Sequence, residues 1–144
     1  MTFTKAHTVL SVLVVTLLVA CAGQDPAVEQ SRQDAVQAVR DFIDVRGLEE
    51  LTELRSSTSD TWEPIEEHFL IYKGRRATYL VEFAHQCREL NDNTRIVADE
   101  RWSANTVRAR FDTIRGCRIG RIFALTEEEV AELENIGESP GSRN

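Results

Sequence analysis

The run Leu17-Leu18-Val19-Ala20-Cys21 constrains this chain most, because it decides which residues remain to fold and in which compartment they do so. It matches a bacterial lipobox, in which aliphatic and small residues lead up to a cysteine at the cleavage point. Lys5 and the apolar run 9–18 precede it, and together they have the parts of a secretory signal. The ten residues of that run are too few to span a bilayer as a helix, which needs about 20. We therefore expect residues 1–20 to be removed and Cys21 to carry lipid.

Two other interpretations of this segment stay open. It is also compatible with an ordinary signal peptide that happens to be followed by a cysteine, or with a short membrane anchor that is never cut. The lipoprotein interpretation predicts attachment to the membrane through acyl chains on Cys21. In the sorting rule of many Gram-negative bacteria, a residue other than Asp after that cysteine favours the outer membrane, and Ala22 stands there. The predicted location is therefore the periplasmic face of the outer membrane.

The rest of the chain has the length of one domain. Cleavage would leave 124 of the 144 residues, which is enough for a single apolar core. Small and polar residues around Pro26 predict a lipidated tether over residues 21–30. We expect the folded domain to occupy residues 31–137 and residues 138–144 to form a polar, disordered tail.

The charge of the mature chain is acidic overall but unevenly distributed. With 16 basic and 24 acidic residues, its net charge of −8 argues against nucleic acid and against an anionic membrane surface as partners of the whole chain. Residues 75–121 nevertheless hold ten arginines against six acidic residues. This stretch is the place to look for an anion-binding surface.

Two helices are predicted at the ends of the domain. Ser31 can cap a first helix that runs to about Arg46, and Gly47 is placed to end it. A second helix is predicted over residues 127–136, followed by Gly137. Its start combines a capping box with a hydrophobic staple, formed by Thr126 with Glu129 and by Leu125 with Val130.

Between the helices the pattern is typical of β-structure. Residues 69–72 and 78–83 flank a turn that contains Gly74, which predicts a hairpin. Segment 51–57 fits either a helical turn or a strand, and we favour a strand, while Pro64 favours an edge position. Further strands are predicted over residues 95–98, 106–114 and 117–124. The expected fold class is α+β, with a small antiparallel sheet or partly open barrel and an N-terminal and a C-terminal helix packed on it.

The arginines of the predicted strand 106–114 suggest a binding surface. Because side chains alternate along a strand, Arg108 and Arg110 should point away from Val107, Ala109 and Phe111, with Asp112 beside them. Either the acidic helices of the same chain, especially residues 127–134, or solvent would neutralise this row, or it would stay open as a docking surface. Guanidinium groups suit the second role because they bind carboxylate or phosphate in a bidentate manner. The candidate binding residues are Arg108, Arg110, Arg118 and Arg121.

A resemblance to a known family follows from four short stretches. They are Tyr79-Leu80-Val81, Cys87 with Leu90, Arg110-Phe111-Asp112, and Cys117-Arg118-Ile119 in a strand that ends at Leu125. This series resembles a family of small exported bacterial proteins, many of them lipoproteins, classed as a domain of unknown function. The resemblance covers roughly residues 60–125 and leaves both predicted helices outside it. It implies a compact, β-rich, exported domain, often with the same two cysteines, and it transfers no catalytic residue.

Cys87 and Cys117 are the two cysteines that remain once Cys21 is acylated. An even number of thiols in an oxidising compartment predicts a disulfide. A redox-active pair usually has the close Cys-x-x-Cys spacing, which these residues lack. We therefore expect a structural bridge, with a catalytic one as the alternative.

Residues that could carry catalysis are few. No Gly-x-Ser-x-Gly elbow, phosphate-binding loop or His-Glu-x-x-His motif occurs, and only His68 and His85 remain after processing. Glu66 and Glu67 adjoin His68, but neighbours on an extended segment point to opposite faces, so we expect no metal and no cofactor.

We therefore expect no catalytic residue. The function expected is a binding or adaptor module whose partner is an envelope protein or an anionic cell-wall polymer. A structural or assembly accessory of an envelope complex and an envelope enzyme are the alternatives.

Overall fold

The computed structural model describes residues 26–57, 59–92 and 105–137. Within these ranges the chain forms two α-helices, eight strands and two 3₁₀-helices. In chain order they are α1 (Pro26–Arg46), β1 (Glu50–Leu51), β2 (Glu53–Arg55), β3 (Thr61–Ile65), η1 (Glu66–His68), β4 (Phe69–Lys73), β5 (Thr78–Phe83), η2 (Arg88–Asp92), β6 (Thr106–Arg108), β7 (Thr113–Ile114), β8 (Cys117–Leu125) and α2 (Glu127–Gly137).

An antiparallel sheet forms the centre of the fold, with strand order β1-β8-β5-β4-β3 and with β7 also paired to β8. Strands β4 and β5 form the predicted hairpin, in which Phe69 lies opposite Glu82 and Lys73 opposite Thr78. The last strand, β8, returns to the centre of the sheet and pairs with β5. The predicted α+β class is confirmed, and the sheet is not closed into a barrel.

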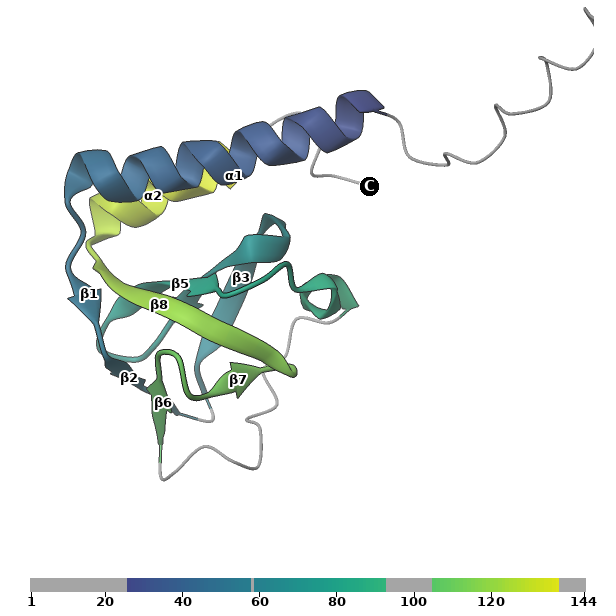
Figure 1. Cartoon of the computed structure of the whole chain (residues 1–144). Helices are drawn as coiled ribbons and strands as arrows, with labels where there is room; N and C mark the ends of the chain where they lie inside the picture. The colour runs from purple at the N-terminus through teal and green to yellow at the C-terminus, as the bar shows by residue number, and fades with distance from the viewer. Residues whose placement is uncertain (1–25, 58, 93–104, 138–144) are drawn as a thin grey trace, which may run out of the picture.

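Both faces of the sheet are buried, and each belongs to its own apolar core. Helices α1 and α2 cover one face (Figure 1), where Phe69, Ile71 and Leu80 pack beneath them. Because neighbours on a strand point to opposite faces, the unbroken apolar run of β4 fits a strand buried on both sides. The second core combines the alternate side chains of β4 and β5 with residues of β2, β6 and η2: Leu70, Tyr72, Val81, Leu54, Val107 and Leu90.

Helix α1 begins at Pro26, five residues before the predicted cap at Ser31. Proline suits the first turn of a helix, because its φ is already helical and its missing N–H would have no intrahelical acceptor there. Residues 26–30 are therefore helical and do not form part of the predicted tether. The helix ends at Arg46 as predicted, and Gly47 follows with a φ of 61°, a left-handed conformation that favours glycine.

Helix α2 begins with the predicted capping box. The backbone N–H of Thr126 donates to Glu129 Oε2 over 2.7 Å, and the N–H of Glu129 donates to Thr126 Oγ1 over 3.3 Å. Leu125 and Val130 both pack against the core beneath the helices, as the staple requires. Leu133 is fully buried in the same core and fixes the helix to the sheet.

The prediction of one strand over residues 106–114 is wrong. The chain forms β6, turns through residues 109–112 and then forms β7. Arg110 has a φ of 67°, which a strand does not contain, and its N–H donates to the carbonyl of Ile119 over 2.9 Å. The turn ends the predicted alternation, so Phe111 is 76% exposed and does not face the core.

The two edges of the sheet are short or interrupted. Segment 51–57, predicted as one strand, is divided between β1, which pairs with β8, and β2, which pairs with β6 in a separate small sheet. At the other edge β3 carries Pro64 opposite Leu70. This position fits the prediction for Pro64, because a proline cannot donate a hydrogen bond within a central strand.

The predicted disulfide is confirmed. Cys87 and Cys117 are bonded, with their Cα atoms 5.7 Å apart. The bridge joins the residue before η2 to the first residue of β8, and Cys87 is fully buried in the second core.

Several predictions concern residues outside the described ranges: the signal over 1–20, lipid on Cys21, the strand at 95–98 and the tail at 138–144. Among the helices of the described part, none has the length and apolar character needed to cross a bilayer.

Candidate functional site

A groove lies between α1 and the sheet, and we call it the helix–sheet groove. It consists of two adjoining pockets of about 380 and about 520 Å³, which share Arg40, His68 and Gln86. The larger one, the arginine pocket, is lined by Arg40, His68, Glu82, Phe83, Ala84, His85, Gln86, Arg110, Gly120 and Arg121. The smaller one, the α1 pocket, adds Glu29, Arg32, Gln33, Val36, Gln37, Glu66 and Glu67.

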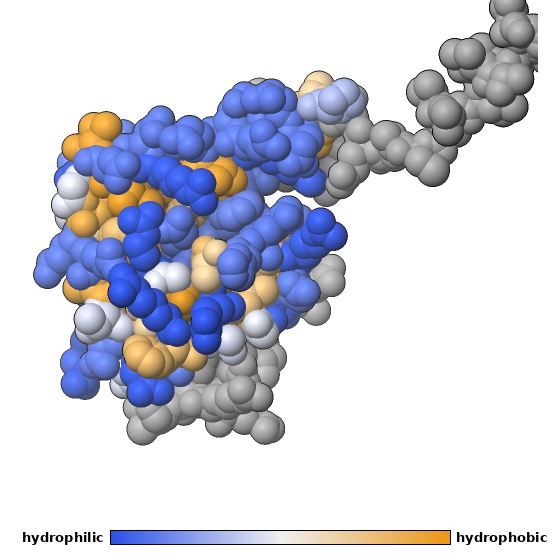
Figure 2. Space-filling view, viewed as in Figure 1, coloured by the Kyte–Doolittle hydropathy of each residue, from blue (hydrophilic) through white to orange (hydrophobic). Residues whose placement is uncertain are grey.

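The arginine pocket has a net positive charge. Three arginines and one glutamate line it, which gives a charge of +2 when both histidines are neutral. Figure 2 shows strongly hydrophilic residues over the face of the molecule in front of β8, below α1. The charge of this pocket is thus opposite to the net charge of −7 of the whole chain.

Glu82 organises two of these arginines. It lies on the helix-covered face of β5 and is only 8% exposed. One carboxylate oxygen is 3.6 Å from Arg40 Nε, which comes from α1, and the other is 2.6 Å from Arg121 Nε on β8. Because both contacts use Nε, they do not occupy the Nη groups that a bound anion would use.

Arg110 reaches the pocket from the turn between β6 and β7. Its left-handed φ directs the chain back toward β8, where its N–H meets the carbonyl of Ile119. The guanidinium is 72% exposed and lies 3.2 Å from Glu50 Oε1. Such an exposed ion pair is worth little and is readily exchanged for another anion.

Gly120 permits the close approach of β8 to β5 at the pocket. The register between these strands shifts between Glu82 and Phe83, as at a β-bulge. A Cβ at Gly120 would lie 3.2 Å from both the Glu82 carbonyl oxygen and the Ala84 nitrogen. Such contacts are closer than ordinary van der Waals distance, so any larger residue would have to displace the backbone of β5 by a few tenths of an ångström.

Residues Glu66, Glu67 and His68 form η1 and not the extended segment that we predicted. Glu66 has a φ of 50°, and the resulting turn places all three residues along the α1 pocket with Arg32 and Arg40 of α1. The argument that separated them onto opposite faces is therefore wrong. Within the described part of the chain, their ligand atoms do not gather closely enough to form a metal site.

Burial shifts the pKa values of two groups in the groove. The pKa of His68 is lowered, first because burial disfavours the imidazolium and second because Arg40 is near, while Glu67 and Glu82 oppose the shift. The pKa of Glu66 is raised by burial, and Arg32 opposes that shift. Both shifts favour the uncharged forms of these two side chains, whereas the charge of the arginine pocket comes from its three arginines and Glu82.

The four arginines predicted as binding residues do not form one row. Arg110 and Arg121 enter the arginine pocket. Arg108 instead contacts Asp112, whose Oδ2 accepts from the Arg108 backbone N–H over 2.7 Å and lies 3.3 Å from its Nε. Arg118 is exposed in β8 opposite Thr113. The structure thus brings together two of the four.

One of our two interpretations expected the acidic residues of α2 to neutralise these arginines. Among the described residues, Arg108, Arg110 and Arg121 form their ion pairs with other acidic side chains of the chain, which are Asp112, Glu50 and Glu82. Glu132 contacts Arg46 of α1, and Glu134 lies 2.8 Å from Lys73 of β4. These contacts attach α2 to α1 and to the sheet.

Arg40, His68 and His85 are groove residues that the sequence did not predict. One signal was available, because Arg32 and Arg40 are eight positions apart and lie on the same face of a helix. No local pattern indicated that this face lies against η1 and the end of β5.

The chain matches the model of one protein family over most of its length. The model of a family described as "Family of unknown function (DUF6491)" matches residues 4–137. This match agrees with the resemblance seen in the sequence, and it also includes α1 and α2, which that resemblance left outside. No curated protein and no solved structure matches the chain.

Proposed function

We propose that this chain, which belongs to a family of unknown function, is a non-catalytic binding module anchored to the bacterial cell envelope. Lipid on Cys21 holds it at the periplasmic face of the outer membrane. The arginine pocket of the helix–sheet groove binds an anionic partner, either an acidic envelope protein or an anionic cell-wall polymer.

The observation that supports this proposal is the meeting of Arg40, Arg110 and Arg121 from three separate elements. Glu82 accepts a hydrogen bond from Arg121 Nε and forms an ion pair with Arg40 over 3.6 Å, so it orients both guanidinium groups before a ligand binds. A preorganised pair of guanidinium groups loses less side-chain entropy when it binds carboxylate or phosphate. The pocket is therefore suited to a ligand with closely spaced negative charges.

The binding test compares two double variants of the full lipidated chain in detergent micelles. Arg110→Gln with Arg121→Gln removes two charges from the pocket. Arg75→Gln with Arg76→Gln removes two exposed charges from the β4–β5 turn, outside the groove. The probes are poly-L-glutamate for an acidic protein and polyphosphate for a cell-wall polymer, titrated at low and at high salt.

The pocket variant should bind its probe about tenfold or more weakly, because it loses hydrogen bonds to charged groups worth about 1.5–3 kcal/mol each. The turn variant should bind nearly as the parent does, and binding by the parent should weaken as salt is added. Equal losses in the two double variants would reject the pocket as the site.

A gain of binding provides an independent test. Glu82→Gln keeps the size of the side chain but removes the carboxylate that Arg40 and Arg121 share. The amide oxygen of Gln can still accept from Arg121 Nε, so the variant loses a negative charge while that arginine stays oriented. If the pocket binds anions, this variant should therefore bind the probe more tightly than the parent, provided that its circular dichroism is unchanged. A folded Glu82→Gln variant with weaker binding would contradict the proposed role of the arginines.

Anchoring is tested by Cys21→Ser. Without the acceptor thiol no lipid can be attached, so the variant should remain unprocessed or be released from the membrane. Cell fractionation and the mass of the protein measure both outcomes. If the variant stays with the membrane at its mature size, the proposed lipid anchor is wrong.

Phe111 favours a second function, that of a structural accessory in an envelope complex. This side chain is 76% exposed, and a protruding aromatic ring is the kind of residue that anchors a protein partner. Capture through Phe111 would persist at high salt and disappear in Phe111→Ser, whereas capture through the arginine pocket weakens with salt.

A further inference from the structure

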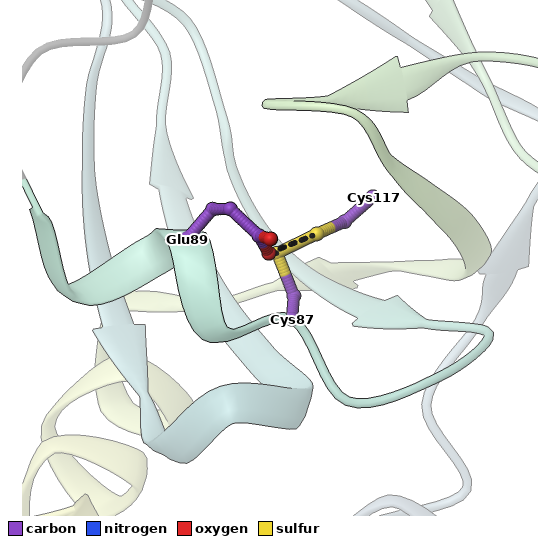
Figure 3. A group of neighbouring side chains, drawn as sticks. All are labelled: Cys87, Glu89 and Cys117. Carbon is purple, nitrogen blue, oxygen red and sulfur yellow. Dashed lines mark hydrogen bonds between the residues drawn. A yellow bond between two sulfur atoms is a disulfide. The ribbon is translucent and has the colours of Figure 1, made fainter.

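Figure 3 shows the carboxylate of Glu89 against the disulfide between Cys87 and Cys117. Glu89 is not among the residues that line the helix–sheet groove. Glu89 Oε2 is 3.3 Å from Cys117 Sγ and 3.8 Å from Cys87 Sγ. Among the described residues, these three are the ones whose possible ligand atoms gather within 4.8 Å of one another. Two sulfur atoms and one carboxylate oxygen thus lie close enough together to be ligands of one cation.

In addition to the bond between the sulfurs, hydrogen bonds to the backbone hold the three residues in place. The N–H of Cys87 donates to the carbonyl of Glu67 over 2.6 Å, which fixes the chain before η2. Arg115 Nη1 donates to the carbonyl of Glu89 over 2.9 Å, which holds η2 against the turn before β8. Cys117 is fixed by its pairing with Ile114. The convergence is therefore a property of the fold.

We propose that, when the bridge is reduced, Cys87, Glu89 and Cys117 bind a thiophilic divalent cation of the zinc class. Tetrahedral zinc with Zn–S near 2.3 Å and Zn–O near 2.0 Å separates a sulfur and an oxygen ligand by about 3.5 Å. In the bridged form the two distances from Glu89 Oε2, 3.3 and 3.8 Å, lie on either side of this value. Cleavage of the bridge must also let the two sulfurs separate to about 3.8 Å, the spacing that tetrahedral zinc requires. Solvent supplies the fourth ligand, because Glu89 is exposed and Cys117 is partly exposed.

The bridge and the cation exclude each other, since each uses both sulfurs. A dithiol reductant supplies two electrons and two protons, so that its own thiols become a disulfide while Cys87 and Cys117 become thiols. Cation binding then releases the two thiol protons to solvent and forms two metal–sulfur bonds and one metal–oxygen bond. In either form η2 remains linked to the start of β8.

The test uses the full chain, reduced by a phosphine that takes up the oxygen of water as the disulfide is cleaved. After removal of the phosphine without air, the protein is titrated with Co²⁺ and then with Zn²⁺. One equivalent of Co²⁺ should produce a sulfur-to-cobalt charge-transfer band together with the visible bands of tetrahedral cobalt, and Zn²⁺ should abolish them. The oxidised chain should give neither set of bands.

Variants identify the ligands. Glu89→Gln should bind Co²⁺ at least about tenfold more weakly, whereas Glu128→Gln, an exposed residue of α2, should bind as the parent does. Cys117→Ser should lose the charge-transfer intensity of one sulfur. Unchanged affinity in Glu89→Gln, or no tetrahedral bands in the reduced parent, would overturn the proposal.

Loss of structure on reduction does not prevent the test. If the far-ultraviolet circular dichroism of the reduced chain decreases, one equivalent of Zn²⁺ should restore it, because the cation would then stabilise the folded state. Failure of Zn²⁺ to restore the spectrum would also overturn the proposal.

Discussion

Arg110 and Glu66, two non-glycine residues with positive φ, both line the helix–sheet groove. A left-handed conformation costs such residues on the order of 1 kcal/mol or more, so it persists only where surrounding contacts enforce it. For Arg110 one such contact is the hydrogen bond to the Ile119 carbonyl. The other two described non-glycine residues with positive φ, Asn105 and Arg115, lie in turns outside the groove.

Phe111 and Ile114, three positions apart, should respond very differently to truncation. Ile114 is fully buried, so Ile114→Ala should lower the free energy of unfolding by about 2–5 kcal/mol through lost contacts and a cavity. Phe111→Ala should change it by less than about 0.5 kcal/mol, because the ring is 76% exposed. Urea denaturation measures both values. A larger loss for Phe111→Ala would mean that the ring is buried in solution.

His68 should make stability depend on pH near neutrality. Its pKa is lowered from 6.5 in the folded chain, so the unfolded state binds more protons below that pH. The contribution of His68 to the free energy of unfolding is complete above pH 6.5. It is lost as the pH falls from 6.5 through the lowered pKa of the folded state. Arg40, Glu67 and Glu82 are the charged groups that act on it.

The measurement is the difference in unfolding free energy between the parent and His68→Gln, taken at several pH values from 5 to 8. This difference should decrease as the pH falls. His85→Gln is the matched control, because His85 is an exposed residue of the same pocket. A difference that stays constant with pH would show that His68 has no shifted pKa.

Elements with complete local signals were predictable, and elements fixed by distant contacts were not. The cap and staple of α2 lie within six consecutive residues, and the β4–β5 hairpin needs only its own turn. The break at Arg110 depends instead on Ile119 and on Thr52, whose carbonyl accepts from Ala109. Arg110 and Arg121 of the arginine pocket were predicted as binding residues, but Arg40 and His68 were missed for the same reason. Their place in the site requires α1 to lie against η1, and no local pattern contains that information.

The cap of α2 should be measurable as a single contribution. Thr126→Ala removes the hydroxyl that accepts from the Glu129 N–H, and should lower the free energy of unfolding by about 1 kcal/mol. Thr126→Ser keeps a hydroxyl and should retain most of the stability. Thermal and urea denaturation of both variants test this. Equal losses in the two would show that the methyl group, and not the cap, matters.

The whole molecule has two cores on opposite faces of one sheet, and they are secured in different ways. Two helices cover the first core, whereas the second is enclosed by short strands, by η2 and by the disulfide. Strands of two or three residues bury little surface by themselves. The second core should therefore depend more strongly on its covalent link.

Removal of the disulfide tests this dependence. Cys87→Ser with Cys117→Ser should lower the free energy of unfolding by about 3–4 kcal/mol, the value expected for opening a loop of this length. Urea denaturation of the parent and of this double variant under non-reducing conditions gives the value. A loss below about 1 kcal/mol would indicate that the short strands are sufficient.

The interrupted edges of the sheet also bear on how copies of the protein behave toward one another. A strand that approached β3 from a second molecule would find no N–H at Pro64 and would meet the exposed charge of Glu63. At the opposite edge β1 offers two residues. Edges that are short, charged or blocked by proline are poor templates for intermolecular strand addition. The protein should therefore resist aggregation into fibrils even where many copies are concentrated on one surface.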